Sequence, residues 1–378
     1  MKPIVPYIKE SVKPKKSLEL DLLAVGNASK SGDCILMRYG DLVSGKKKQT
    51  VIMIDGGFSD TATNTKRYLK KYYNCYYDGK YHIDYMFLSH PDSDHINGLV
   101  ELLKDDEIAL GYLIAALPWE EATPAWYKDG RITPNSLEKT LEEAFSKLQE
   151  LTELAEGKNA KICGLQEQGV FDLEHEATLT ILGPEKKFYN VCIANCEKTP
   201  EQAPQVVMMS ESASGSDDAE EAYVPGKIKW DYSESTSPIN ESSMVFLFEY
   251  DGQKFLFCGD AGKEALKAAF DFADENDISL DDINVIKMPH HGSRHNVTPE
   301  LMDRVKGKNT SCYISCVAGQ EGHHPSKRLV NMLREKGFKV FKTSGNGLCR
   351  RYNTPLRKGW NSLSTMKVYP KMEKLKNA

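Results

Sequence analysis

The sequence contains no segment that resembles a membrane span or a secretion signal. No run in its 378 residues approaches the roughly 20 consecutive apolar residues that a bilayer-crossing helix needs. The first ten residues lack the apolar core of a signal peptide. We therefore expect a protein that does not associate with a membrane and that works in the cytoplasm.

The cysteines do not indicate a thiolate metal site or a disulfide framework. The nine cysteines are scattered, odd in number, and never form a Cys-x-x-Cys motif. Paired spacings of that kind are typical of structural zinc sites, and an even, regular set is typical of disulfide-rich secreted domains. We expect reduced thiols, as in a cytosolic protein.

Excess positive charge is also missing. The formal net charge is −5 and the pI is about 6.0, so overall charge does not provide the basic surface of many nucleic-acid-binding proteins. Lysines gather locally at positions 13–16, 46–48 and 66–71, and we interpret each group as solvated surface. Any contact with nucleic acid is therefore expected to be local.

The residues that are present indicate a globular α/β protein. A chain of 378 residues, 40% of them hydrophobic, suffices for one large domain or two ordinary ones. Apolar strands and amphipathic helices follow one another in both halves of the chain, which is typical of α/β proteins. The predicted strands are 18–25, 33–39, 49–54, 83–88, 244–250, 254–258, 283–288, 311–317 and 339–342, and the predicted helices are 65–73, 96–104, 263–272 and 326–336.

The middle of the chain differs from its two flanks. Residues 136–156 combine good helix formers with apolar residues at three- and four-residue spacing, which predicts one long amphipathic helix. Residues 179–182 predict a strand, and the Ser-, Asp- and Glu-rich segment 210–221 predicts a mobile loop. We therefore predict an arm at 1–17, a domain at 18–360 with an insertion at about 109–237, and a tail at 361–378.

Four of the apolar strands end in residues that can bind a metal. These residues are Asp55, the group from His90 to His95, Asp260, and His290 with His291. Neighbouring strand ends converge along one edge of a packed sheet, so the four groups are expected to share one crevice. Histidine is scarce, with nine in the chain, yet four of them lie in two of these loops.

The loop His90-Pro-Asp-Ser-Asp-His95 predicts a centre for two ions. Alternate residues of an extended segment point the same way, so His90 and Asp92 can hold one ion. Asp94 and His95, at the turn into the next helix, can hold a second, and the two oxygens of Asp260 can bridge both. Two ions about 3.5–4 Å apart can activate a water and neutralise charge on a phosphoryl oxygen. The alternative is a capping loop with Asp94 as N-cap, which explains one aspartate and neither histidine.

These motifs together resemble the metallo-β-lactamase superfamily, in particular the hydrolase domain of the DNA-uptake channel protein ComEC and its stand-alone relatives. The resemblance extends over residues 18–352, with a break at the insertion, and does not include the membrane channel of ComEC. It rests on Met53-Ile-Asp-Gly-Gly57, Leu88-Ser-His-Pro-Asp-Ser-Asp-His95, Phe257-Cys-Gly-Asp-Ala-Gly262, Met288-Pro-His-His-Gly-Ser293, His324-Pro325 and Thr343–Gly347.

The resemblance implies a role for each of these residues. His90 and Asp92 resemble ligands of one metal, and Asp94 and His95 resemble ligands of the other, with Asp94 also a base near the bridging water. Asp260 resembles the bridging ligand.

The remaining positions resemble supporting residues or the last ligand. Asp55 resembles a residue that orients the ligands. His290 resembles the last ligand and His291 a phosphate-facing neighbour, or the two exchange roles. Ser293 and His324 are candidates to bind phosphate oxygens. Alternatively, Ser293 caps a helix and His324 only precedes the turn at Pro325.

Two positions depart from the superfamily pattern. Asp92 stands where the superfamily usually has His, and no His occurs in the segment 238–243, where Asn240 takes that place. The first metal site is therefore rich in oxygen ligands, which shifts preference from zinc towards manganese or magnesium.

The sequence thus predicts an α/β protein with the αββα sandwich of the metallo-β-lactamase fold, two mixed sheets flanked by helices. It also predicts one or two divalent ions, zinc or manganese with magnesium as a further option. The expected activity is hydrolysis of a phosphodiester, most simply in DNA, by a metal-activated water. The alternatives are a hydrolase of a small molecule such as a cyclic nucleotide, phosphonate, lactone or thioester, or a non-catalytic subunit that binds a protein partner through the insertion.

Overall fold

We describe the fold from a computed structural model. It describes residues 15–27, 30–42, 48–165, 167–203, 220–305, 309–317, 324–354, 356–358, 360 and 362–375. Most of the predicted arm, lysines 46 and 47, and residues 210–219 of the predicted acidic loop lie outside these residues. Among the helices described, none is long and apolar enough to cross a membrane.

The first sheet combines strands of the N-terminal half with one late strand. Within the described residues it has eight strands in the order β18-β1-β4-β5-β7-β8-β9, with β6 paired to β7. The bounds are β1 Ser17–Leu22, β4 Cys34–Gly40, β5 Gln49–Gly56, β6 Tyr76–Tyr77, β7 Lys80–Phe87, β8 Ile108–Ile114, β9 Lys161–Cys163 and β18 Leu348–Tyr352.

The second sheet is built from the later part of the chain. Its seven described strands follow the order β10-β11-β13-β14-β15-β16-β17. The bounds are β10 Gly169–Leu173, β11 Ala177–Gly183, β13 Val245–Tyr250, β14 Gln253–Phe257, β15 Val285–Lys287, β16 Ser311–Ile314 and β17 Lys339–Lys342. Two short ladders complete the strands, β2 Gly26–Asn27 with β3 Lys30–Ser31, and β12 Glu220–Ala222 with β19 Lys371–Glu373.

Both sheets are mixed, and they follow the same pattern of directions. Along each order the first three pairings are antiparallel and the last three are parallel. The change falls between β5 and β7 in the first sheet and between β14 and β15 in the second. Because parallel neighbours end at the same edge of a sheet, the loops after these four strands open on one side of the molecule.

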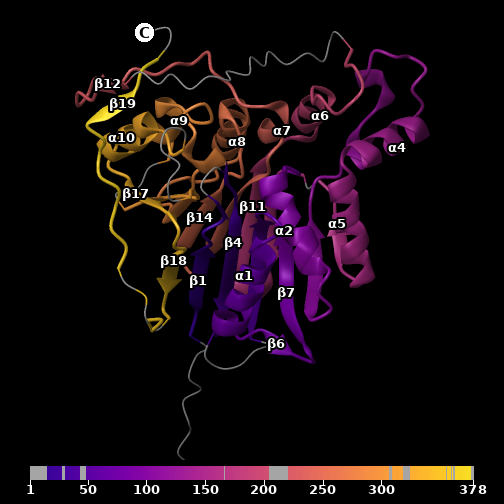
Figure 1. Cartoon of the computed structure of the whole chain (residues 1–378), viewed down its shortest axis with the longest axis horizontal. Helices are drawn as coiled ribbons and strands as arrows, with labels where there is room; N and C mark the ends of the chain where they lie inside the picture. Colours follow the sequence, from indigo (N-terminus) through magenta and orange to yellow (C-terminus); the bar gives the residue numbers. More distant parts are fainter. Residues whose placement is uncertain are drawn as a thin grey trace, which may run out of the picture.

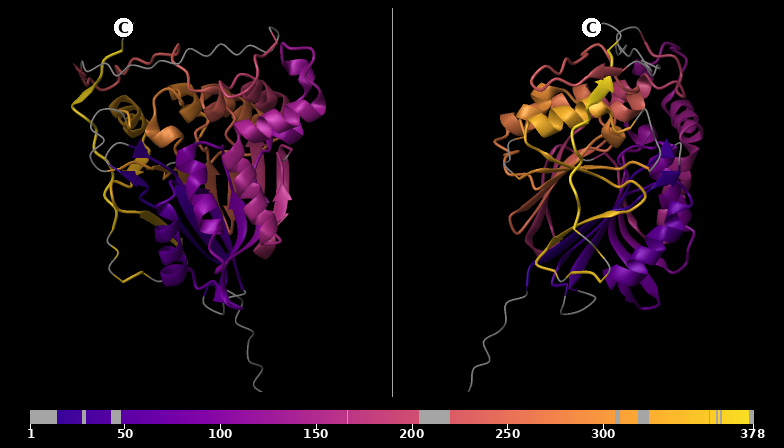
Figure 2. Two further views of the ribbon diagram at one scale, coloured as in Figure 1. Left: turned by 45° about the vertical axis from the view of Figure 1, so that its right-hand side comes forward. Right: turned by 60° about the vertical axis from the view of Figure 1, so that its left-hand side comes forward.

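Helices cover the outer face of each sheet, so the molecule has four layers (Figure 1, Figure 2). The predicted αββα arrangement is therefore confirmed. On the side of the first sheet lie α1 Thr61–Tyr68, continued by a π-helical turn at Leu69–Tyr73, α2 Ser93–Leu103, α3 Pro118–Glu121, α4 Pro134–Ala144, α5 Ser146–Gly157 and α6 Lys186–Ala194. On the side of the second lie α8 Lys263–Glu275, α9 Pro299–Asp303 and α10 Lys327–Glu335, and the short α7 Pro238–Glu241 lies between α6 and α8.

Three apolar clusters fill the spaces between the four layers. Strand β4 shows how the alternation of a strand serves two of them. Ile35, Met37 and Tyr39 pack between the two sheets, whereas Cys34 and Leu36 face the helices on the other side. Each fully buried side chain of this size contributes about 1.5–3 kcal/mol to stability. A third cluster joins α8 and α10 to the second sheet.

Close backbone packing fixes α2 against the end of β5. The N–H of Gly98 donates to the carbonyl of Gly57 at 2.8 Å. A Cβ on Gly98 would lie 1.8 Å from the carbonyl oxygen of Gly56, so this approach requires glycine. The start of α2, which carries His95, is thereby held beside Asp55.

The predicted insertion at 109–237 contains strands of both sheets. Strands β8 and β9 extend the first sheet, and β10 and β11 open the second. The polar and glycine residues within β8, such as Gly111 and Tyr112, interrupt its apolar run. Its strand structure comes from parallel pairing with β7, which local sequence does not reveal. Among the described residues of this stretch, the helices α3–α6 and strand β12, which pairs with β19, lie apart from the two main sheets.

Two further predictions need correction. The single helix predicted at 136–156 is divided into α4 and α5 at Phe145, whose φ of −111° and ψ of 38° are not helical. The Phe145 side chain is buried in the cluster on the first sheet, so the bend lets both helices pack. In addition, Glu220 and Glu221 of the predicted loop and Lys371–Glu373 of the predicted tail form the β12–β19 ladder, with Met372 buried.

Candidate metal centre

The loops after four strands bring a cluster of histidines and aspartates together between the two sheets. Asp55 lies near the end of β5, and His90 follows β7. Asp260 follows β14, and His291 lies in a short 3-10 turn after β15. Asp55 and His291 have φ values of 55° and 52°, a conformation that is costly for residues other than glycine and is concentrated at functional sites.

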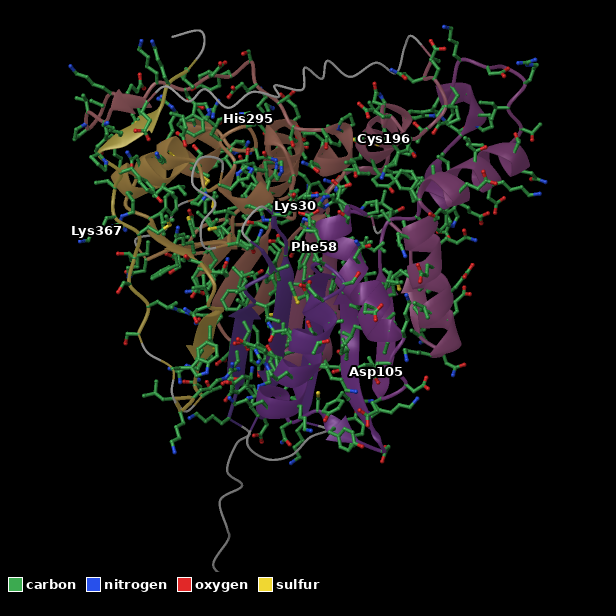
Figure 3. All side chains as sticks on the ribbon, viewed as in Figure 1. Lys30, Phe58, Asp105, Cys196, His295 and Lys367 are labelled. Carbon is green, nitrogen blue, oxygen red and sulfur yellow. The ribbon has the colours of Figure 1, made fainter. Side chains whose placement is uncertain are left out.

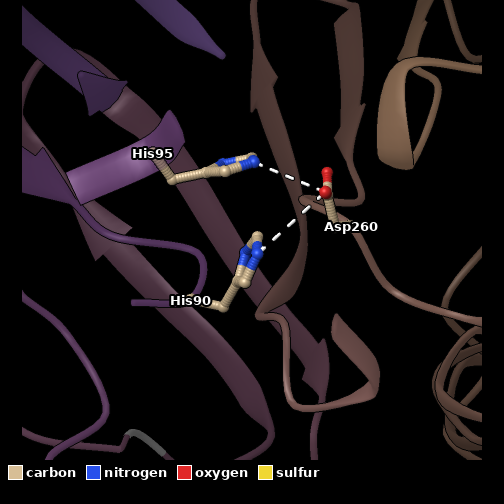
Figure 4. Close-up of side chains that lie close together, drawn as sticks. All are labelled: His90, His95 and Asp260. Atoms are coloured by element: carbon tan, nitrogen blue, oxygen red, sulfur yellow. Dashed lines mark ion pairs between the residues drawn. The ribbon is translucent and has the colours of Figure 1, made fainter. Parts of the chain in front are cut away.

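The first group consists of His90, His95 and Asp260, whose candidate ligand atoms all lie within 4.8 Å of one another. Oδ2 of Asp260 is 3.4 Å from Nε2 of His95 and 4.0 Å from Nε2 of His90. Figure 4 shows both rings directed at this carboxylate. Zinc bonds of about 2.0–2.2 Å at tetrahedral angles place ligand atoms about 3.3–3.6 Å apart, so the spacing suits an ion.

The second group consists of Asp94, His95 and His291. Oδ2 of Asp94 is 3.2 Å from Nε2 of His291 and 3.8 Å from Nε2 of His95. Because His95 belongs to both groups and offers one free nitrogen, it can serve one ion at a time. Asp260 contacts His95, the residue that the two groups have in common.

The side chain of Asp92 lies beside His90 and does not cap α2. Oδ2 of Asp92 is 3.6 Å from Nε2 of His90. Asp92 is the N-cap residue of α2, and its side chain makes no capping hydrogen bond. The alternative in which Asp94 is the N-cap therefore does not hold, since Asp94 lies in the first turn of the helix.

Buried nitrogens without hydrogen-bond partners fit a metal centre. Among the described residues, Nε2 of His90 and Nε2 of His95 are buried and have no hydrogen-bond partner. Such atoms cost free energy unless they bind something. Imidazole nitrogens and carboxylate oxygens form the ligand set that zinc and manganese accept, so these residues fit a divalent cation.

Hydrogen bonds at the opposite nitrogen fix the orientation of these rings. Oδ2 of Asp55 is 2.8 Å from Nδ1 of His95. The same carboxylate accepts hydrogen bonds from the backbone N–H of Ser89 at 2.8 Å and from its hydroxyl at 2.7 Å. Oγ of Ser89 in turn lies 3.1 Å from Nδ1 of His90. Contacts of this kind are typical of metal-binding histidines, and they place Asp55 in an orienting position.

The charges of the cluster favour a cation. Burial alone would lower the pKa of His95, but Asp260 and Asp55 hold it well above its ordinary value. Burial alone would raise the pKa of Asp94, but His291 and His95 hold it below its ordinary range. The negative charge that stabilises a protonated imidazole also stabilises a metal ion, so protons and metal compete for these nitrogens.

His290 and Asn240 contact each other, and the N–H of His290 also donates to Asp260. Nδ1 of His290 is 3.1 Å from Oδ1 of Asn296, 3.4 Å from Nδ2 of Asn240 and 3.5 Å from Oγ1 of Thr236. Burial lowers the pKa of His290. In the described residues His291, and not His290, belongs to a group with metal-binding spacing.

Ser293 and His324 lie near the last histidines. Oγ of Ser293 accepts a hydrogen bond from the N–H of His295 at 3.2 Å, so it stabilises the following turn. The ring of His324 lies 5.4 Å from that of His290 and 6.2 Å from that of His291. His324 therefore reaches the edge of the cluster.

Two buried residues of the site were missed by sequence reasoning. Asp33, just before β4, forms a buried ion pair with Lys287 at the end of β15. The signal was present: Lys287 is an ionisable residue in the otherwise apolar strand predicted at 283–288, and lysine is rarely buried without a partner. The partner could not be predicted because it lies in the other sheet.

A four-layer αββα sandwich with a His/Asp cluster at the strand ends is the metallo-β-lactamase fold. No family model matches the chain. ComE operon protein 3 of Bacillus subtilis is 28% identical over 132 residues, which cover 35% of this chain. The match spans only 15% of the length of that relative.

Solved structures of low sequence identity are also similar. The metallo-β-lactamase fold protein YhfI of Bacillus subtilis is 9% identical, with 89% of this chain and 100% of that chain covered and a TM-score of 0.42. Yeast PDE1 is 11% identical, with coverage of 88% and 99% and a TM-score of 0.45. Zinc-bound PqqB of Methylobacterium extorquens is 9% identical, with coverage of 88% and 99% and a TM-score of 0.42.

Proposed function

We propose that the protein is a metal-dependent phosphodiesterase that hydrolyses DNA. One observation carries the proposal: Oδ2 of Asp260 faces Nε2 of both His90 and His95, beside the contact between Asp94 and His291. The two ligand groups adjoin at His95, and with Asp260 beside it the cluster has enough ligands for two cations. Such centres stabilise both the attacking and the leaving oxygen of a phosphoryl transfer.

The residues of the cluster would form two metal sites. His90, Asp92 and Asp260 would hold one divalent ion, and Asp94, His95 and His291, with Asp260, would hold the other. When bound, these ions supply Lewis acidity for a water and for the phosphoryl oxygens.

Other groups would act on the substrate and on protons. Oδ2 of Asp94 would accept the proton of the attacking water, because it lies beside Nε2 of both His95 and His291. His324 would donate a hydrogen bond to a phosphate oxygen from the edge of the site.

The choice of DNA rests on the resemblance of the motifs to the hydrolase domain of ComEC. The net charge of −5 is consistent with local contact near the cluster instead of a long basic track. We propose manganese as the activating ion, with zinc as the second choice, because Asp92 makes the first group rich in oxygen. We also propose that the reaction takes place in the cytoplasm.

Metal-stripped protein reloaded separately with manganese, zinc or magnesium tests the proposal. We expect bound metal by elemental analysis and cleavage of bis(p-nitrophenyl) phosphate and of linear or circular DNA. Asp94→Ala should abolish cleavage. Asp105→Ala is the matched control, because Asp105 (labelled in Figure 3) lies just beyond the C-terminal end of α2 and pairs with Lys66, so the length of the helix separates it from His95.

Other outcomes would favour the alternatives. Turnover of lactones, thioesters or cyclic nucleotides without cleavage of DNA would replace the nuclease with a small-molecule hydrolase. Absence of turnover for every substrate, combined with tight binding of a protein through α3–α6, would replace it with a partner-binding subunit. RNA cleavage faster than DNA cleavage would overturn the choice of DNA.

A further inference from the structure

A second buried carboxylate, Asp33, lies at the cluster beside Asp55 and His95, with the candidate ligand atoms of all three within 4.8 Å of one another. Asp33 is 1% exposed and lies between the β2–β3 ladder and β4. Its Oδ1 is 3.6 Å from Nδ1 of His291. In the described residues both of these atoms are buried and have no hydrogen-bond partner. The two atoms therefore face each other at slightly more than hydrogen-bond distance.

Asp33 also contacts Asp94 through the backbone. Its N–H donates to the carbonyl of Asp94 at 3.1 Å. Asp94 is the residue whose Oδ2 lies 3.2 Å from Nε2 of His291. Asp33 thus contacts both His291 and the backbone of Asp94, which come from different halves of the chain.

Lys287 holds the Asp33 carboxylate in place. Nζ of Lys287 pairs with Oδ2 of Asp33 and donates to the carbonyl of Met288 at 2.8 Å. Burial alone would lower the pKa of Lys287, but Asp33 raises it, so the ammonium stays charged. A buried ammonium is costly without a charged partner, which ties Lys287 to Asp33. Oδ2 is therefore occupied, and Oδ1 is left for His291.

The arrangement matches the one at Asp55. There, a buried carboxylate contacts Nδ1 of His95 and leaves Nε2 towards the ligand group. Here, a buried carboxylate faces Nδ1 of His291 and leaves Nε2 towards Asp94. Carboxylates in this position orient metal-binding histidines and raise their basicity.

We infer that Asp33, held by Lys287, is a positioning residue that aligns His291 and Asp94 for the second ion. The inference rests on the proposed function in one respect, that the cluster binds divalent metal. It assigns the two carboxylates separate tasks. Asp55 aligns the rings of His90 and His95, and Asp33 aligns His291.

Paired variants test this role without leaving an unpaired buried charge. Asp33→Ala with Lys287→Met removes the ion pair and the acceptor for His291. Asp33→Asn with Lys287→Met removes the same charges and keeps an acceptor of nearly the same shape. Asp21→Asn is the control for loss of a buried ion pair, because Asp21 on β1 pairs with Arg357 at 2.7 Å and with no residue of the cluster.

Metal titration monitored by calorimetry and by the visible spectrum of cobalt is the first measurement. We expect two ions in the wild type. We expect the affinity for the second ion to fall about 10- to 100-fold in the alanine variant. The asparagine variant should recover most of that loss, and Asp21→Asn should bind both ions normally. Wild-type affinity for both ions in the folded alanine variant would overturn the inference.

Crystal structures of the metal-free wild type and alanine variant are the second measurement. We expect the His291 ring to rotate or become disordered only in the variant, while the His95 ring keeps its place. An unchanged His291 ring overturns the inference. If the wild type binds no divalent ion, the proposed function fails, and this comparison of metal-free proteins still decides the role of Asp33.

Discussion

The two halves of the fold place an aspartate at the same point and use it differently. Asp55 lies near the end of β5, and its Oδ1 accepts the N–H of Ser89, in the loop after β7. Asp260 lies just after β14, and its Oδ1 accepts the N–H of His290, in the loop after β15, at 3.1 Å. In each half the carboxylate fastens the loop that follows the next strand.

The two aspartates differ in what their second carboxylate oxygen, Oδ2, contacts. Oδ2 of Asp55 contacts Nδ1 of His95 and the hydroxyl of Ser89, so it faces the side of the ring turned away from the ligand group. Oδ2 of Asp260 faces Nε2 of His90 and of His95. A single strand-end position can therefore serve as a support in one half and as a candidate ligand in the other, depending on which nitrogen it meets.

Asp260→Asn should have the largest effect on metal binding and on activity. The amide keeps the shape but removes the charge that we propose both ions share, so both ions should be lost from stoichiometric binding. We expect phosphodiester hydrolysis to fall by about 10³-fold or more. Elemental analysis and initial rates with bis(p-nitrophenyl) phosphate measure the two effects. Retention of two ions with normal rates would contradict the bridging role.

Asp55→Asn should have a smaller effect, because it changes a supporting contact. We expect both ions to bind, with affinity reduced about 10- to 100-fold. Excess metal should then restore most of the rate, which it should not do for Asp260→Asn. Measurement of rate against free metal concentration separates the two variants. An Asp55 variant that no metal concentration rescues would show that Asp55 is a ligand itself.

The sequence predicted which strand ends carry these aspartates and histidines, but not which atoms they contact in the folded protein. The four strand ends that carry Asp55, His90, Asp260 and His290 were predicted because local apolar runs stop there. The role of Asp33 was missed because its partner Lys287 lies in the other sheet. Similarly, the motif resemblance put His290 first as the last ligand, whereas the structure places His291 in a group with ligand spacing.

The strand boundaries show the same limit. Strand β17 was predicted with its observed bounds, since a local apolar pattern suffices for it. Strands β8 to β10 were assigned to an insertion. Strand β8 joins the first sheet through parallel pairing with β7, β9 through pairing with β8, and β10 joins the second sheet through β11, and none of these pairings can be seen in the local apolar pattern. The short ladder of β12 with β19 joins residues about 150 positions apart and could not be predicted from composition.

Asp92→His tests how the first half differs from the usual superfamily pattern. The imidazole replaces an oxygen ligand by nitrogen beside His90, which favours zinc over manganese. We expect the ratio of zinc to manganese affinity to rise about tenfold, at little cost to stability because the Asp92 side chain is 34% exposed and makes no capping bond. Competition titration of the two metals checks this. An unchanged ratio would mean that Asp92 does not contact the ion.

Glu373→Ala should give the smallest effect. It tests a difference in capping between the N-terminal ends of two outer helices, α2 and α10. The N-terminal end of α2 receives no side-chain cap from Asp92. The N-terminal end of α10 receives two, Ser326 and the carboxylate of Glu373 on β19, which accepts the N–H groups of Lys327 and Arg328 at 2.6 and 3.0 Å. Loss of such a cap costs about 1 kcal/mol.

We expect urea unfolding of Glu373→Ala to show that loss in the free energy of unfolding, with metal content and phosphodiesterase rate unchanged. Asp172→Ala is the control, because it removes an exposed carboxylate on the edge strand β10. A fall in metal affinity in Glu373→Ala would mean that β19 also supports the loop of His324, since that loop leads directly into α10. The C-terminal strand would then belong to the functional site as well as to the fold.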